Sequence, residues 1–241
     1  MRLGLYEIKR VLYKIGRREG ILSLCQFFYH EFKLTIWRPL IKKSWSGSEE
    51  DIIIDNLLGN KKTGYYVDVG AYDAWVGSNT KRFYNKGWQG IIIEPDVVRY
   101  RRFLKDRKND INLNIGLSDK PSKLTFYVMF PESLSTFSRE MMEKRRDERY
   151  TLIKEVQVQV DTLANIFTKC AGSKEIDFIS IDTEGYDYNV LLGNDWKKYK
   201  PKVICVEKSS YEDQERIEKY LRELGYIKAT ETIGNLIYTR P

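Results

Sequence analysis

Short apolar runs alternate with amphipathic segments from about residue 50 to the end of the chain. This alternation predicts βαβ units and a mostly parallel sheet with helices on both faces, closed by a C-terminal hairpin. The expected strands are 65–69, 90–93, 111–115, 124–128, 156–160, 177–181, 201–206, 226–230 and 236–239. The expected helices are 49–58, 79–86, 96–108, 138–149, 162–169 and 211–224. Ser48 (with Asp51 as a capping box), Ser78 and Asp161 are expected to cap three of them.

The first 45 residues follow a different pattern. Residues 3–18 carry apolar side chains at helical spacing, and a second apolar and aromatic stretch covers 21–37. The segment 42–47 is typical of a linker. We therefore predict a basic helical extension over 1–45 and one domain over 46–241.

The charge is concentrated in this extension. The chain carries 41 Lys and Arg against 34 Asp and Glu, a net charge of +7. Residues 1–43 contain ten basic and three acidic side chains and so hold the whole excess. The neutral remainder gives no reason to expect nucleic acid as a partner. Basic and aromatic side chains together suit contact with an anionic membrane, but the same helices could pack on the body or on a second subunit.

The cysteines and apolar runs bear on the compartment. The three cysteines include no C-x-x-C pair, so neither a disulfide framework nor a zinc site is indicated. The apolar run 21–29 is not followed by a small-residue cleavage site, which makes a secretory signal the weaker interpretation. No apolar run reaches the ~18 residues of a membrane-spanning helix. We expect a cytoplasmic protein, with any membrane contact at the inner face.

Four predicted strands end in an acidic residue. Asp68, Glu94 and Glu207 each close a strand, and Asp182 closes another with Glu184 two residues on. In open α/β sheets, ligands bind beyond the carboxyl ends of the strands, so these acids are expected to converge on one site. A single such acid could simply cap the next helix, but four at one edge indicate a functional site.

The sequence of loop 70–77 restricts the class of ligand that the site could bind. It contains no G-x-G-x-x-G, and the chain has no G-K-[ST] P-loop. A glycine turn followed by an acid at the next strand end still suits an adenosine ligand, because the carboxylate can take both ribose hydroxyls. S-adenosylmethionine is such a ligand and needs no pyrophosphate site.

Five blocks of the chain, in the same order, resemble the FkbM-type methyltransferase family. They are YVDVGAYDAWVGSNTKRFYNKGWQGIIIEP, LSTFS, VQVDTL, DFISIDTEGYDYNVL and PKVICVE. The resemblance covers roughly residues 46–241. It implies a class I methyltransferase (Rossmann-like) fold, with a seven-stranded mostly parallel sheet and an antiparallel C-terminal hairpin. It also implies S-adenosylmethionine as donor and O-methylation of hydroxyls, often on sugars of bacterial surface polysaccharides or on secondary metabolites. We expect a sugar hydroxyl of a bacterial polysaccharide or glycoconjugate as the acceptor. Many members have glycine where this chain has Ala74.

The resemblance also implies roles by position. Asp68 and Gly70 are expected to line the methionine part of the donor, and Glu94 to hold its ribose. Residues 116–118 are expected to flank the adenine. The full set of expected donor contacts is Asp68, Gly70, Ala71, Ser78, Asn79, Glu94, Pro95, Gly116, Leu117, Ser118 and Asp182. Ser78 and Asn79 could meet the donor carboxylate at a helix start, although Ser78 could equally be a plain N-cap.

Acids are the candidate catalytic groups. The only histidine, His30, lies outside the predicted site, which leaves Asp182, Glu184 and Glu207 as candidate bases. Asp182 and Glu207 could instead hold a divalent cation such as magnesium, which prefers oxygen ligands. Ser135, Thr136 and Arg139, between strands, could face the acceptor.

Other functions remain open at this point. The same chemistry could act on RNA or on a protein side chain, and a non-catalytic scaffold could keep the fold. The intact strand-end acids argue against a scaffold, and donor binding would separate the two classes.

Overall fold

The computed structural model describes residue 29, residues 32–146 and residues 150–240. The predicted helix at 3–18 and most of the apolar stretch 21–37 lie outside these residues. Helix η1, a π-helix, spans Lys33–Lys42. No helix in the described part of the chain is long and apolar enough to cross a bilayer.

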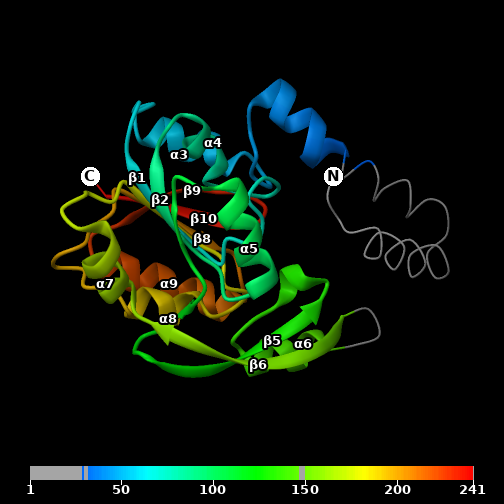
Figure 1. Ribbon diagram of the computed structural model, residues 1–241. Helices are drawn as coiled ribbons and strands as arrows, with labels where there is room; N and C mark the ends of the chain where they lie inside the picture. Colours follow the sequence, from blue (N-terminus) through cyan, green and yellow to red (C-terminus); the bar gives the residue numbers. More distant parts are fainter. Residues whose placement is uncertain (1–28, 30–31, 147–149, 241) are drawn as a thin grey trace.

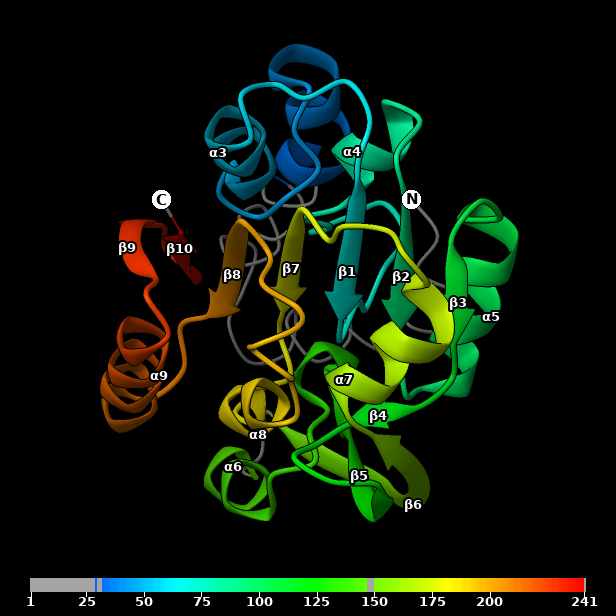
Figure 2. The same cartoon turned by 90° about the vertical axis from the view of Figure 1, so that its left-hand side faces the viewer.

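The main sheet has seven strands in the order β3-β2-β1-β7-β8-β10-β9 (Figures 1 and 2). Strands β3, β2, β1, β7 and β8 run parallel to one another, and β10 is antiparallel to both of its neighbours, β8 and β9. This confirms the class I methyltransferase fold with its antiparallel final hairpin. The bounds are β1 Tyr65–Val69, β2 Gln89–Ile93, β3 Ile111–Leu113, β7 Phe178–Ile181, β8 Val203–Glu207, β9 Ile227–Glu231 and β10 Asn235–Thr239.

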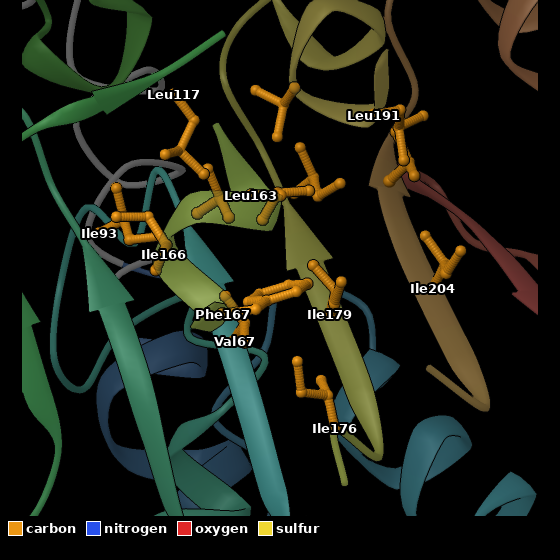
Figure 3. Packing of buried hydrophobic residues seen from close by; sticks show 14 of the residues in the cluster. Val67, Ile93, Leu117, Leu163, Ile166, Phe167, Ile176, Ile179, Leu191 and Ile204 are labelled. Atoms are coloured by element: carbon orange, nitrogen blue, oxygen red, sulfur yellow. The ribbon is translucent and has the colours of Figure 1, made fainter. Parts of the chain in front are cut away.

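Both faces of the sheet are covered, as the continuous apolar runs predict. Val67 and Ile179 point to one face, where they pack with Phe167 and Leu191 (Figure 3). Tyr66 and its neighbours on adjacent strands point to the other face. The helices are α3 Glu50–Leu57, α4 Lys81–Asn85, α5 Val97–Asp106, α6 Arg139–Arg145, α7 Leu163–Ile166, α8 Asp187–Leu192 and α9 Tyr211–Glu223, with η2 Glu132–Leu134 and η3 Phe167–Ala171.

Two predicted strands form a separate sheet. Residues 124–128 and 156–160 lie in β5, Ser122–Phe130, and β6, Thr151–Asp161, which pair antiparallel. Strand β4, Gly116–Leu117, joins β6 and completes the order β4-β6-β5. Figures 1 and 2 show this sheet beyond the carboxyl ends of the main strands, so it forms one wall of the space there.

None of the three predicted residues is the N-cap of its helix. At α4 the N-cap is Thr80, and Ser78 lies two residues before it. Helix α3 begins after Glu49 with no side-chain cap. Asp51 instead accepts hydrogen bonds from residues that precede the helix. Its carboxylate accepts from the hydroxyls of Ser44 at 2.6 Å and Ser46 at 3.0 Å, because the chain before α3 folds back over it. At α7 the cap is Thr162 rather than Asp161, since the Thr162 hydroxyl accepts from the N–H of Asn165 at 3.1 Å.

Candidate active site

The carboxyl ends of β1, β2 and β7 open on a cavity of about 1100 Å³. A pocket for one drug-sized ligand usually measures roughly 300–1,000 Å³, so this cavity has room for a donor and part of an acceptor. The predicted site residues that line it are Asp68, Gly70, Ala71, Ser78, Asn79, Glu94, Pro95, Gly116, Leu117, Ser135, Asp182 and Glu184. Most of the predicted site residues therefore line one cavity at the carboxyl edge of the sheet.

Four predicted residues do not line the cavity. Ser118 is buried and donates to Asp119 at 2.9 Å. Thr136 is fully buried, where its hydroxyl donates to the carbonyl of Glu184 at 2.9 Å and accepts from the N–H of Ser138 at 2.9 Å. Arg139 is exposed and pairs with Glu143 at 2.8 Å. The fourth, Glu207, lies beside Asp182 in an acid cluster described below.

Ser135, Ser78 and Asn79 line the cavity but already have partners within the protein. The Ser135 hydroxyl accepts from the N–H of Met129 at 3.1 Å. Ser78 accepts from the N–H of Lys81 at 3.1 Å, so an N–H that we expected to meet the donor carboxylate has an acceptor already. Asn79 donates to the Ser180 hydroxyl at 3.0 Å. These three polar side chains therefore stabilise the local backbone and its neighbours even without a ligand.

Gly70 is required by a close backbone approach. Its φ is +74°, and a Cβ there would lie 1.8 Å from the carbonyl oxygen of Asp182. A side chain would force the ends of β1 and β7 apart. The glycine therefore allows the loop after β1 to lie directly beside Asp182, which brings two halves of the site together.

Asp68 is a buried carboxylate at the floor of the cavity. It accepts a hydrogen bond from the Thr80 hydroxyl at 2.6 Å. Burial raises the pKa of Asp68 to about 6, and the Thr80 hydroxyl and the Arg107 guanidinium act against that rise.

Arg107, which the sequence reasoning missed, organises this floor from below. It is fully buried and donates to the Thr80 hydroxyl at 2.6 Å, to Asp110 at 3.0 Å and to the carbonyl of Ala74 at 3.2 Å. Because the Thr80 oxygen accepts from Arg107, its own proton is directed to Asp68. The only sequence signal was Asp110, three residues after Arg107.

Glu94 ties the loop after β1 to the end of β2. One carboxylate oxygen accepts from the N–H of Tyr72 at 2.9 Å, and the other from the N–H of Asp96 at 2.8 Å. Burial raises the pKa of Glu94 to about 7. Each oxygen keeps a further lone pair, so the carboxylate can still accept from a ligand hydroxyl.

An acid cluster stands at the ends of β7 and β8. Carboxylate oxygens of Asp182, Glu184 and Glu207 lie within 4.8 Å of one another. The protein atoms packed around Asp182, and then the carboxylates of Glu184 and Asp187, raise its pKa well above the ordinary value, although part of the side chain stays open to solvent. Burial and the Asp182 charge also raise the pKa of Glu207.

Within the acid cluster only Glu184 has a cationic partner among the described residues. The guanidinium of Arg145, on α6, lies 2.5 Å from its carboxylate, and both side chains are largely buried. Burial raises the pKa of Glu184, and Arg145 opposes that rise. The ion pair with Arg145 thus favours the ionised form of Glu184, against the effect of its burial.

An apolar wall completes the cavity near β4. The rings of Phe126 and Phe137 lie 4.8 Å apart, and both line the cavity with Leu117. A Cβ on Gly116 would lie 2.4 Å from the Phe137 ring, so the glycine allows that ring its position. An apolar wall, a buried carboxylate at the end of β2 and acids near β1 and β7 suit the adenine, ribose and sulfonium of S-adenosylmethionine.

Comparisons with solved structures give only distant similarities. The METTL16 methyltransferase domain is 10% identical with a TM-score of 0.43, covering 78% of this chain and 64% of its own. Precorrin-8w decarboxylase from Methanobacterium thermoautotrophicum is 15% identical with a TM-score of 0.42, covering 80% and 90%. A putative RNA methyltransferase from Pyrococcus horikoshii is 11% identical with a TM-score of 0.39, covering 78% and 84%. No curated protein matches by sequence.

A family model gives the informative match. The methyltransferase FkbM domain matches residues 68–228, which is more than half of the chain. The matched segment begins at Asp68 and includes Glu94 and the acid cluster. The protein therefore belongs to the FkbM methyltransferase family, whose methyl donor is S-adenosylmethionine.

Proposed function

We propose that this protein transfers a methyl group from S-adenosylmethionine to a hydroxyl oxygen of a sugar in a bacterial polysaccharide or glycoconjugate. One observation carries the proposal: the buried carboxylates Asp68 and Glu94 share a single cavity with Asp182 and Glu184. The first pair suits a donor, and the second suits an acceptor hydroxyl that must lose a proton.

The donor side of the proposal follows from the contacts. Glu94 accepts from the ribose hydroxyls with the lone pairs that its two backbone bonds leave free. Asp68, held by Thr80, lies near the methionine part and attracts the sulfonium charge. The adenine lies against the apolar wall of Leu117, Phe126 and Phe137.

Asp182 is the proposed general base. The sulfonium donor is already activated, so the protein must align the acceptor oxygen with the methyl group and accept its proton. A base works best when its pKa is close to the working pH, and the raised pKa of Asp182 moves it in that direction. Glu184 is held in place by its ion pair with Arg145, while Glu207 shares the proton with Asp182.

Exposed aromatic rings at the cavity favour a sugar acceptor. Tyr72 and Trp75 line the cavity and are both exposed. One face of each ring is covered by a cation, Arg99 at 3.7 Å from the Tyr72 centroid and Lys81 at 3.5 Å from the Trp75 centroid. The opposite face of such a ring suits the C–H face of a pyranose, while hydroxyls reach the polar groups around it. The neutral charge of the chain beyond residue 43 supports this acceptor over RNA.

Magnesium is the alternative occupant of the acid cluster. Asp182 and Glu207, with Glu184 beside them, would supply oxygen ligands of the kind magnesium prefers. There the ion would orient the acceptor hydroxyl and lower its pKa. Activity that survives a chelator would leave Asp182 as base, whereas activity restored by added magnesium would support the cation.

The decisive experiment supplies radiolabelled donor with three acceptor pools: bacterial glycans, total RNA and unfolded protein. We expect label in the glycan pool as an O-methyl sugar, and loss of labelling in Asp182→Asn. Glu212→Gln, an exposed acid on α9, is the matched control and should label normally. Label found only in RNA or protein would overturn the sugar acceptor, and absence of donor binding by calorimetry would overturn the enzyme itself.

A further inference from the structure

Helix η1 carries a row of exposed apolar side chains. Phe32, Ile36 and Leu40 are 50%, 47% and 64% exposed. Phe32 is the N-cap of η1, and a π-helix, with its i→i+5 bonds, takes a little over about four residues per turn. Residues four apart therefore stay close to the same side, and these three side chains form one stripe. Tyr29 precedes it and Ile41 adjoins it, at 67% and 66% exposed. These five residues are called the apolar stripe below.

The other side of η1 is fastened to the methyltransferase domain. Arg38, two residues from both Ile36 and Leu40, donates to the carbonyl of Ser46 at 3.0 Å. The Arg38 carbonyl accepts from the N–H of Ser44 at 3.4 Å. Ser44 and Ser46 are themselves bonded to buried Asp51. The orientation of η1 is therefore fixed through Arg38, and the apolar stripe is left facing outward.

The arrangement of these side chains makes them unusual. Single exposed apolar residues are normal on any protein surface, but a contiguous row marks an interaction site. In Figures 1 and 2 the helix η1, in blue, lies at the outer edge of the molecule, away from β5 and β6. The described part of the chain contributes nothing that covers the stripe.

The charge of the N-terminal segment, read from the sequence, bears on which partner the stripe binds. Residues 1–43 hold the entire net charge of +7, and Lys42 and Lys43 end the helix with exposed side chains. A second copy of the chain would bring the same positive charge to the interface, which opposes association. An anionic lipid surface supplies both missing features, because its headgroups are negative and its acyl boundary accepts apolar side chains.

We propose that η1 docks along the surface of an anionic lipid bilayer. The apolar stripe enters the headgroup boundary, and the flanking lysines lie at the level of the lipid phosphates. The inference rests on the stripe and on the charge distribution, and it holds whatever acceptor the cavity takes.

The test uses the full-length protein and vesicles of phosphatidylcholine with or without phosphatidylglycerol. We expect co-sedimentation with the anionic vesicles only. Added salt should lower the vesicle affinity by about fivefold for each basic side chain whose contact with the lipid it screens. Ile36→Asp with Leu40→Asp should lower the partition coefficient by about tenfold or more. The matched control is Ile153→Asp, because Ile153 is 46% exposed, as Ile36 nearly is, and lies in β6, which Figures 1 and 2 show away from η1. Donor binding by calorimetry confirms that each variant is folded.

Several outcomes would overturn the proposal. The wild-type protein could ignore anionic vesicles at low salt, or the stripe variant could sediment like the wild type. A third contrary result is a wild-type dimer that becomes monomeric in the stripe variant without any vesicle binding. That result would assign the stripe to a second copy of the chain.

Discussion

Removing one hydroxyl under the cavity floor should weaken both the fold and the donor site. The Thr80 hydroxyl receives a hydrogen bond from Arg107 and donates one to Asp68, both at 2.6 Å, and Thr80 is fully buried. Thr80→Val keeps the shape of the side chain and removes both bonds. Arg107 then loses one of its acceptors, and Asp68 loses its only hydroxyl donor among the described residues.

The expected size of the effect follows from the contacts. A hydrogen bond to a charged group contributes typically ~1.5–3 kcal/mol, and the two bonds share one oxygen. We therefore expect Thr80→Val to lower the free energy of unfolding by about 3 kcal/mol. Thr80→Ser keeps the hydroxyl and loses one methyl group, which costs about 1 kcal/mol. Donor affinity should fall about tenfold in the valine variant and recover in the serine variant, because Asp68 is held in place again.

Denaturant unfolding and calorimetric titration with S-adenosylmethionine measure the two quantities. Thr63→Val, on an exposed turn, is the matched control and should change neither. If Thr80→Val and Thr80→Ser lower the free energy of unfolding equally, the stability depends on the methyl group of Thr80 and not on its hydroxyl. If stability falls in the valine variant but donor affinity stays at the wild-type value, then Thr80 supports the core and has no part in donor binding.

Three further predictions address the cavity. Glu94→Ala should weaken donor binding by roughly 10- to 100-fold in calorimetry, because it removes hydrogen bonds worth ~1.5–3 kcal/mol. Asp182→Asn should bind the donor but lose about 100-fold or more of its turnover in single-turnover assays, and wild-type turnover would remove it as base. Donor affinity should fall as the pH drops through about 7 and then about 6, where Glu94 and Asp68 take up protons. As the pH falls over the same range, the free energy of unfolding of the free protein should rise, because folding raises the pKa of both carboxyl groups and the folded state therefore binds their protons more tightly. Stability and donor affinity should therefore change in opposite directions with pH.

The sequence predicted the main sheet and its acidic edge because both rest on local patterns. Continuous apolar runs become strands buried on two faces, and the residue that ends each run lies at the common edge. Asp68, Glu94 and Asp182 followed directly from this rule. The FkbM resemblance supplied the order of the blocks and the donor, which periodicity alone does not give.

The missed features depend on contacts between distant segments. Strand β5 pairs with β6 across a long interval, with Ser122 opposite Val160, so its separation from the main sheet has no local signal. Arg107 ends a basic helix that looks solvated, and it is buried only because Tyr66, Thr80 and Asp110 converge on it from other elements. Apart from Asp110, three residues after Arg107, these partners have no local sequence pattern that could have identified them.

In the mechanism proposed above, the acids of the cavity lie along the path that charge takes during methyl transfer. The donor holds its positive charge on sulfur, and as the methyl group moves that charge passes to the acceptor oxygen and leaves as a proton. Acids that face the donor stabilise the bound state before reaction, whereas acids that face the acceptor stabilise the charge that develops later. Loss of Glu94 should therefore raise the donor KM with little change in kcat, and loss of Asp182 should lower kcat with little change in that KM. Because the loop at Gly70 lies against the carbonyl of Asp182, the two groups of acids are held next to each other, and the charge needs to move only a short distance between them.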